Sequence, residues 1–335
     1  MSMRAIRIND FGDADVLEYL ETDDLAPATG EVLVDVKACG LNHLDLRVRR
    51  GEFPYLPLPV VPGTDVAGRN AETGEPVVLY PVISCGSCRF CTSGREHVCP
   101  ELRLIGVHRD GGCAERIAVP ARNVVPVNDS LGMTDWAATP VVFLTAWHAL
   151  IGRANLRVGE TILIHSASSG LGTAAVQIAS AGGATVIATA SNPDKLQRAK
   201  DLGAHHAINY REIDFADAVR DLTEGRGVDV VMEHVGGPTL VESVSCLSRG
   251  GRLVCCGETG SPSATIALRP LFNRERTILG SYLGSRKEFT DVMHLLGAKS
   301  LKPVVDATFP LERTAEAHEY LEGRHAFGKV VVKVA

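Results

Sequence analysis

The stretch TILIHSASSGLGTAAVQIASAGGATVIATA (residues 161–190) starts with an apolar run and turns through serines and glycines. It then continues in small, helix-forming residues and ends in a second apolar run. Such a strand, turn, helix and strand make one βαβ unit. The rhythm recurs downstream in VDVVMEHV (228–235) and GRLVCCG (251–257). Alternating apolar runs and helical segments predict an α/β fold, with a doubly wound parallel sheet between two layers of helices.

The turn inside this unit predicts dinucleotide binding. Its pattern is a degenerate G-x-G-x-x-G, which on its own is also compatible with a plain structural turn. The position after a strand and before a helix favours binding, because the free N–H groups and the dipole of a helix N-terminus attract a pyrophosphate. We expect the cofactor at six consecutive residues: Ala167, Ser168, Ser169, Gly170, Leu171 and Gly172.

The end of the next strand indicates which dinucleotide is bound. An NAD enzyme places Asp or Glu there for the ribose hydroxyls. This chain has ATASNPDKLQR (188–198), in which Ser191, Lys195 and Arg198 lie near the tip and Asp194 comes three residues late. We therefore expect NADP(H), with NAD(H) as the less favoured cofactor.

Four cysteines are concentrated in CGSCRFCTSGREHVC (residues 85–99). Cys85, Cys88, Cys91 and Cys99 match a closed tetrahedral thiolate site, for which zinc is the usual metal. An iron–sulfur cluster also takes four thiolates, but a Gly/Ser loop between strands fits structural zinc better. We expect one structural Zn²⁺ per chain at these cysteines, with no coordination position open to a substrate.

The remaining composition is that of an ordinary globular protein. The chain has 335 residues, a net charge of -6 and no basic block, so nucleic-acid binding is not expected. Neither a signal peptide nor a membrane span is expected, and five scattered cysteines suit a reducing, cytoplasmic location. The first part of the chain is rich in short strands such as EVLVDVKACG (31–40), which alternates apolar and polar residues.

Together these parts resemble the zinc-containing medium-chain dehydrogenase/reductase superfamily, which includes alcohol dehydrogenases, quinone oxidoreductases and enoyl reductases. The resemblance covers essentially the whole chain. It implies three segments: a GroES-like catalytic β-barrel domain with the four-cysteine lobe (1–129), a Rossmann NADP(H)-binding domain (130–272), and the end of the Rossmann sheet with a return to the first domain (273–335).

The departures from the family pattern concern a second, catalytic zinc. In alcohol dehydrogenases of this family three segments supply its ligands, and here they read ACGLNHLDLRVRRG (38–51), PGTDVAG (62–68) and VVFLTAW (141–147). By this alignment Asn42, Thr64 and Val141 stand at the ligand positions, and Leu44 replaces the hydroxyl that relays the alcohol proton. Such side chains do not supply the soft or imidazole donors of an open zinc site. We expect no catalytic Zn²⁺.

The segment GLNHLDLRVRRGEFP (40–54) instead resembles the quinone oxidoreductase branch, as do PGTDVAG and HSASSGLGTAAVQ (165–177). In NADPH-dependent members of that branch a Lys and a Tyr hold the 2′-phosphate, and the matching residues here are Lys195 and Tyr210. That branch often lacks the cysteine lobe. The chain is thus a hybrid that keeps the structural zinc lobe and lacks the catalytic zinc ligands.

The resemblance implies hydride transfer from NADPH to a quinone or an α,β-unsaturated carbonyl. Asn42 would donate to the carbonyl oxygen and Asp45 would orient its loop, while Thr145 would position the nicotinamide. His43 would touch the cofactor pyrophosphate. The other cofactor contacts are expected at Val235, Gly257 and Leu283. Tyr55, His108 and water remain open as proton donors.

Two alternatives remain. In the first, His43 and Asp65, with Cys39 or His108, hold a weak second zinc, and the protein is an alcohol dehydrogenase with atypical ligands. In the second, the chain binds NADPH as a non-catalytic structural protein. The expected partners are a small carbonyl, enone or quinone substrate and a second or further copies of the chain. NRERTILGSYLG (273–284) is the segment expected to pair across a homodimer or homotetramer interface.

Overall fold

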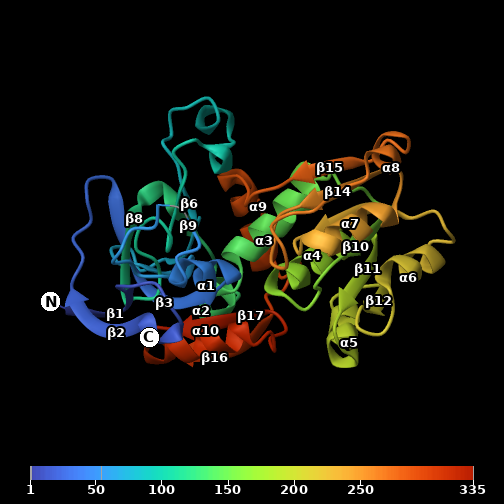
Figure 1. Cartoon of the computed structure of the whole chain (residues 1–335). Coiled ribbons are helices and arrows are strands. Elements are labelled where there is room, and N and C mark those ends of the chain that lie inside the picture. Colours follow the sequence, from blue (N-terminus) through green and yellow to red (C-terminus); the bar gives the residue numbers. More distant parts are fainter. Residues whose placement is uncertain (1, 54, 335) are drawn as a thin grey trace. The chain divides into compact units, whose positions relative to one another are not determined.

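The computed structural model describes residues 2–53 and 55–334 of the chain. The chain divides into two compact units (Figure 1). Unit 1 contains residues 1–142 and 285–335, and unit 2 contains residues 143–284. Both chain termini therefore belong to unit 1, and unit 2 is inserted between its two segments.

Unit 1 is built around a sheet in the order β16-β17-β3-β4-β5-β9, with β8 paired to β3. The long strand β3 (Glu31–Leu41) lies between β17 (Lys329–Lys333) and β4 (Asp65–Asn70), antiparallel to both. The C-terminal strands thus pair with an N-terminal strand, as Figure 1 shows in red and blue. The other strands are β5 (Pro76–Leu79), β8 (Arg116–Pro120), β9 (Val124–Pro126) and β16 (Val305–Pro310).

The core of unit 1 forms because alternate residues of these strands point to one side. Val34 and Val36 of β3 pack with Val66, Val77 and Ile117 from the neighbouring strands. Two small sheets complete the unit, and their strands are β1 (Ser2–Ile8) with β2 (Leu17–Asp23) and β6 (Val82–Ile83) with β7 (Arg103–Leu104). Its helices are α1 (His43–Arg49), α2 (Met133–Ala137), α9 (Arg286–Gly297) and α10 (Thr314–Glu322).

Unit 2 is a six-stranded, fully parallel sheet in the order β12-β11-β10-β13-β14-β15. This is the order 3-2-1-4-5-6 of a Rossmann sheet, and it confirms the predicted α/β fold. The strands are β10 (Thr161–Ile164), β11 (Thr185–Ala190), β12 (His206–Asn209), β13 (Val228–Glu233), β14 (Leu247–Cys255) and β15 (Thr277–Gly280).

The helices of unit 2 follow the strands in turn. They are α4 (Gly170–Ala181), α5 (Pro193–Asp201), α6 (Phe215–Leu222), α7 (Gly237–Cys246) and α8 (Leu268–Phe272), and α3 (Pro140–Trp147) leads into the unit. Phe215 and Val219 of α6 and Val244 of α7 pack on Leu163 and Val231 of the strands. The sheet is buried on this face, as its apolar runs predict.

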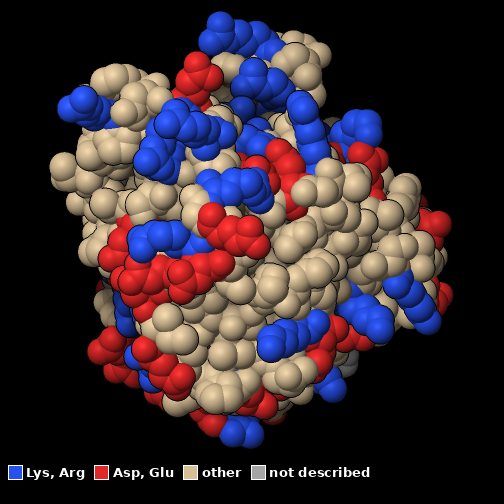
Figure 2. Space-filling model, turned by 90° about the vertical axis from the view of Figure 1, so that its right-hand side faces the viewer, with Lys and Arg blue, Asp and Glu red and all other residues tan. Residues whose placement is uncertain are grey.

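The surface has no dominant sign of charge on the face shown in Figure 2, where acidic and basic side chains are mixed with uncharged ones. No helix among the described residues has the length and apolar character that a bilayer crossing requires.

Candidate active site and metal centre

The four cysteines of the lobe converge in the structure. They lie on the loop between β6 and β7, which projects from unit 1 (Figure 1). The Sγ atom of Cys88 lies 3.5 Å from that of Cys91 and 3.8 Å from that of Cys99. Cys85 Sγ lies 3.6 Å from Cys99 Sγ and 3.8 Å from Cys91 Sγ. All four sulfur atoms lie within 4.8 Å of one another.

This geometry fits a zinc ion. Tetrahedral ligands with a Zn–S distance of about 2.3 Å place their sulfur atoms about 3.8 Å apart. The backbone N–H groups of Ser87 and Cys88 donate to Cys85, and these bonds lower the pKa of that thiol to about 6. Backbone donors of this kind stabilise the thiolate form that binds metal. In the part of the chain that the structure describes, these cysteines are the one group of three or more His, Cys, Asp or Glu side chains close enough to hold a metal ion.

The predicted cofactor residues of unit 2 gather at one edge of its sheet. In a Rossmann sheet the ligand lies at the carboxyl ends of the strands, where the strand order reverses. That reversal falls between β10 and β13. The segment 167–172 follows β10, Ser191 follows β11, and Tyr210 follows β12. Val235, Gly257 and Leu283 follow β13, β14 and β15 in the same way.

The turn after β10 leads directly into the N-terminus of α4. Ser169 caps α4, and its side chain accepts a hydrogen bond from the Gly172 N–H at 2.9 Å. A Cβ atom on Gly172 would lie 2.2 Å from the Ser166 carbonyl oxygen, so only glycine allows the helix to start this close to the turn. The N-terminus of a 12-residue helix thus lies at the switch point, which is the position at which Rossmann sheets in general bind a pyrophosphate.

Ser191, Lys195 and Tyr210 come from adjacent strands. Ala190 of β11 is paired in register with Asn209 of β12, so Ser191 and Tyr210 are the next residues at the same edge. Asn192 caps α5 by accepting a hydrogen bond from the Lys195 N–H at 2.9 Å, which places Lys195 in the first turn of that helix. Half of the Tyr210 side chain is exposed.

Thr145 also belongs to unit 2 and lies buried in α3. Leu283 has a φ of 48°, and the following Gly284 packs closely on α3. A Cβ atom on Gly284 would lie 2.6 Å from Leu144 Cδ1 and 3.0 Å from His148 Cβ. The structure therefore brings the Leu283 turn against the part of α3 that carries Thr145.

A buried polar cluster in unit 1 contains Asn42 and Asp65. Asn42 follows β3 directly, Asp65 begins β4, and Lys329 begins β17. Because β3 lies between the other two strands, Lys329 meets Asn42 and Asp65 at one end of the sheet. These contacts span 287 and 264 positions of the sequence. Gly40 lets α2 pack closely on this end of β3, since a Cβ atom there would lie 2.2 Å from the Ala137 carbonyl oxygen.

The hydrogen bonds of this cluster use both ends of the Asn42 amide. Lys329 Nζ donates to Asn42 Oδ1 at 2.7 Å, and Asn42 Nδ2 donates to Asp65 Oδ2 at 3.0 Å. Lys329 Nζ also forms an ion pair with Asp65 Oδ2 at 2.8 Å. The other Asp65 oxygen, Oδ1, accepts from the Val141 N–H at 2.8 Å. The side chains of Asp65 and Lys329 are 0% and 4% exposed, so the pair is shielded from water.

Asp45 holds the loop around Asn42 through two backbone hydrogen bonds. Its two carboxylate oxygens accept from the Asn42 N–H at 2.7 Å and the Gly63 N–H at 3.2 Å. Burial raises the pKa of Asp45 to about 6, against the opposing effects of the Asn42 hydrogen bond and the Lys329 charge. His43, the first residue of α1, is at the surface. Desolvation of its ring by the surrounding atoms lowers the pKa of His43, and the charges of Arg324 and Lys329 act in the same direction.

The residues named for an atypical zinc site have other surroundings. Cys39 is hydrogen-bonded to Cys113, and this bond, together with burial, raises the pKa of the Cys39 thiol. His108 Nδ1 accepts from the Leu104 N–H at 3.0 Å. Both carboxylate oxygens of Asp65 are engaged as described above. Thr64, beside Asp65, is buried, and its hydroxyl has no hydrogen-bond partner among the described residues.

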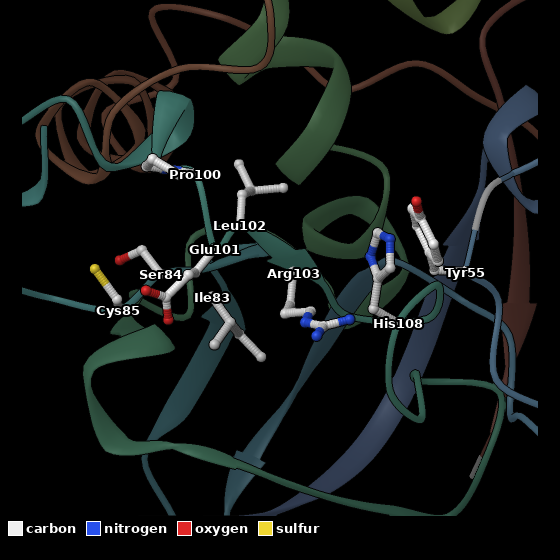
Figure 3. A pocket seen from close by; sticks show the side chains of 9 residues that line it. All are labelled: Tyr55, Ile83, Ser84, Cys85, Pro100, Glu101, Leu102, Arg103 and His108. Atoms are coloured by element: carbon white, nitrogen blue, oxygen red, sulfur yellow. The ribbon is translucent and has the colours of Figure 1, made fainter. Parts of the chain in front are cut away.

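A cavity of about 560 Å³ opens on unit 1 next to the cysteine lobe (Figure 3). Arg103, His108 and Tyr55 lie side by side at one end of it, whereas Glu101 and Ser84 lie toward the other. The structure thus brings the two side chains predicted as proton donors, Tyr55 and His108, into the same cavity. Its lining residues are Tyr55, Ile83, Ser84, Cys85, Pro100, Glu101, Leu102, Arg103 and His108.

The wall of this cavity packs on the backbone of Gly63, and Gly63 is hydrogen-bonded to the Asn42 loop through Asp45. The loop that carries His108 includes Gly106, where a Cβ atom would lie 2.6 Å from the Gly63 backbone. Gly63 in turn donates to Asp45.

Sequence reasoning missed Lys329. It lies in GKVVVKVA (328–335), where a lysine at a strand end is typical of an exposed position. Two features of the sequence point to Lys329. Gly328 comes directly before it, and the strand that it begins is expected to return to the first domain.

Comparisons with known proteins agree with this structure. Residues 28–129 match the alcohol dehydrogenase GroES-like domain, and residues 170–298 match the zinc-binding dehydrogenase domain. A zinc-type alcohol dehydrogenase-like protein of Schizosaccharomyces pombe is 36% identical, over 95% of this chain and 94% of that protein. Human quinone oxidoreductase is 32% identical, over 98% of this chain and 97% of that protein. The crystal structure of an NAD-dependent alcohol dehydrogenase superposes with a TM-score of 0.94 at 38% identity, covering 99% of this chain and 100% of that one.

Proposed function

The chain belongs to the zinc-type alcohol dehydrogenase-like superfamily of medium-chain dehydrogenases/reductases and is an oxidoreductase, and from this we propose that it reduces quinones or α,β-unsaturated carbonyls with NADPH and without a catalytic zinc. Unit 2 binds the cofactor in this proposal. Unit 1 supplies the polar groups that bind the acceptor. The four cysteines hold a structural zinc that takes no part in the reaction.

One observation supports a metal-free reaction most strongly. The charge that neutralises the buried Asp65 carboxylate is an ammonium of the chain itself, Lys329, at 2.8 Å. A metal ion at this carboxylate would have to displace the ammonium and the hydrogen bonds from Asn42 and Val141. The three segments that carry zinc ligands in related alcohol dehydrogenases present Asn42, Thr64 and Val141 here, none with a thiolate or imidazole.

The reaction balances without a Lewis acid. The bound nicotinamide cofactor would supply a hydride to the β-carbon of an enone, and the π electrons of the C=C bond would then move toward the carbonyl oxygen. Asn42 donates a hydrogen bond to that oxygen while it carries the negative charge. A proton then reaches the α-carbon or, for a quinone, the oxygen. The cofactor, when bound, supplies the hydride, and the protein residues supply orientation and electrostatics.

The cavity beside the lobe is the best candidate for the outer part of the acceptor site. Its donor-rich end, formed by Tyr55, His108 and Arg103, suits carbonyl or carboxylate oxygens of the acceptor. Because His108 Nδ1 accepts a backbone hydrogen bond, its proton is on Nε2 when the ring is neutral. Tyr55 and His108 both remain candidates for the proton donor, with water as the third.

We propose that copies of the chain associate through β15. This strand is the outer strand of its sheet, and an unpaired sheet edge favours pairing with another chain. Leu268 and Phe272 of the neighbouring α8 and Tyr282 after β15 are large apolar or aromatic side chains left exposed. A homodimer or a tetramer of such dimers would cover them.

The test is an acceptor screen with one protein preparation. NADPH oxidation is followed with an ortho-quinone, a short enone and an enoyl thioester, and NADP⁺ or NAD⁺ reduction is followed with primary and secondary alcohols. We expect turnover on a quinone or an enone and none on alcohols. Asn42→Ala should lower kcat/KM by about 100- to 1,000-fold, as loss of one oxyanion donor does.

The control variant is Asn9→Ala, because Asn9 is an exposed residue whose side-chain amide donates to Glu18, away from the Asn42 cluster. It should leave turnover unchanged. Alcohol oxidation would instead support a dehydrogenase with atypical zinc ligands. Tight NADPH binding without turnover on any acceptor would support a non-catalytic role. Either result would overturn the proposal.

A further inference from the structure

The ammonium group of Lys329 is a buried charge of the Asn42 cluster that the hydride-transfer scheme leaves without a role. We propose that Lys329 is a positioning residue for the acceptor site: it fixes the Asn42 amide so that one N–H remains directed to the acceptor oxygen, and its charge strengthens that donor. This inference rests on the proposed function, since it assumes that an acceptor oxygen binds at Asn42.

The hydrogen bonds allow a single orientation of the Asn42 amide. Its oxygen faces the Lys329 ammonium at 2.7 Å, and its nitrogen faces the Asp65 carboxylate at 3.0 Å. A flipped amide would set N–H groups against the ammonium and the oxygen against the carboxylate, and both contacts would be repulsive. Lysine and aspartate together therefore lock the amide in a way that neither does alone.

The locked amide retains one donor. An amide nitrogen carries two N–H groups, and Asp65 accepts one of them. The second is the group that can bind an acceptor oxygen. Because hydrogen bonds in a chain polarise one another, an ammonium on the amide oxygen makes the remaining N–H a stronger donor.

The charge balance around Asn42 also requires Lys329. Asp65 lies in direct contact with the amide, and Asp45 accepts from the Asn42 backbone N–H at 2.7 Å. Both carboxylates are fully buried. Without the ammonium they would oppose the negative charge that develops on the acceptor oxygen during hydride addition. Lys329 offsets one of these charges, so its removal should affect the transition state more than the bound acceptor.

Stability alone gives a weak reason for this ion pair. Replacing a buried ion pair by apolar residues of similar volume is often neutral or stabilising. A lysine that only balanced Asp65 would have no need of the second bond, to Asn42.

The test combines kinetics with the side-chain amide signals of Asn42. In the first part, kcat and KM for the acceptor and Kd for NADPH are measured for wild type, Lys329→Met, Asn42→Ala and the double variant. We expect Lys329→Met to lower kcat by about 10- to 100-fold, with KM and the NADPH Kd changed less than about threefold. In the Asn42→Ala background the same substitution should have a clearly smaller effect, because the action through the amide is gone and only the offset of the Asp65 charge remains.

Two further variants control for folding and position. Lys329→Arg retains the positive charge and should recover part of the lost kcat. Lys333→Met alters an exposed lysine of the same strand and should change nothing. Because Lys329→Met alone leaves Asp65 unpaired, Asp65→Asn/Lys329→Met removes both charges and keeps the cluster neutral. It should fold and still have a low kcat.

The second part measures the hydrogen bonding of the Asn42 side chain and does not depend on turnover. Nuclear magnetic resonance of protein labelled with ¹⁵N in asparagine side chains should give slowly exchanging amide protons for Asn42, and fast exchange in Lys329→Met and in Asp65→Asn/Lys329→Met. A kcat that falls equally in both Asn42 backgrounds, or Asn42 signals that Lys329→Met does not alter, would overturn the positioning role. If the wild-type protein turns over no quinone or enone, the proposed function fails, and the amide signals still decide whether Lys329 holds Asn42.

Discussion

At the scale of single residues, the buried charges of unit 1 are gathered around one amide. Asp45 holds the backbone of Asn42, and Asp65 and Lys329 hold its side chain. The carboxylates and the ammonium are all nearly or fully buried, so their interactions act at short range and are poorly screened by salt. The reactivity proposed for this chain depends on that balance of charges.

The pKa of Asp45 gives a stability prediction with a definite sign. Burial raises this pKa to about 6 in the folded protein, from about 3.9 in an unfolded chain. The folded state therefore binds this proton more tightly, and the resulting stability is fully present below pH 4 and is lost as the pH rises through 6. We expect the free energy of unfolding of the wild type, relative to Asp45→Asn, to fall by about 3 kcal/mol between about pH 4 and pH 6.5.

Urea unfolding of both proteins at closely spaced pH values measures this difference. Because asparagine does not titrate, other groups cancel in the comparison. A difference that stays constant, or rises with pH, would contradict the buried, proton-binding environment of Asp45.

At the scale of elements, the sequence predicts the features that neighbouring residues form, and it does not predict the contacts between residues far apart in the chain. The α4 turn and the cysteine lobe were predictable because the residues involved are close in the chain. The N-cap of α2 is Gly132, which has no side chain to accept a hydrogen bond. Ser130 bonds to Asn128 in the preceding turn.

The cysteine lobe predicts the result of losing one ligand. Cys91→Ser removes one thiolate of four, and we expect the protein to lose its zinc and its melting temperature to fall by about 5–10 °C. The control is Ser93→Ala, an exposed residue of the same loop that should retain full zinc content. Metal analysis and thermal unfolding of the same samples check both. A Cys91→Ser protein that retains one zinc per chain would contradict four-cysteine ligation.

The strand ends of unit 2 predict the cofactor preference. Lys195→Ala should lower kcat/KM for NADPH by about 10- to 100-fold through loss of a charge-assisted contact with the 2′-phosphate, and should leave kcat/KM for NADH nearly unchanged. Lys200→Ala, near the other end of α5, is the matched control. Steady-state kinetics with both cofactors test this prediction. An equal loss of kcat/KM for NADPH and NADH would contradict a contact between Lys195 and the 2′-phosphate.

At the scale of the whole molecule, the sequence was sufficient for the fold class and the family but not for the centre of unit 1. The βαβ rhythm, the glycine turn and the cysteine spacing all predict the architecture that the structure has. The contact of Lys329 with Asn42 spans 287 residues, and no local pattern encodes it. Asn42 and Asp65 were found through the departures from the family pattern, whereas Lys329 required the pairing of β17 with β3.

The most direct test of the account is the zinc-to-chain ratio of the purified protein, measured by plasma mass spectrometry on the sample used for turnover. The account predicts one zinc per chain, held by the cysteines, in a sample that reduces a quinone or an enone with NADPH. Two zinc ions per chain, with turnover lost when the weaker one is removed by a chelator, would contradict it.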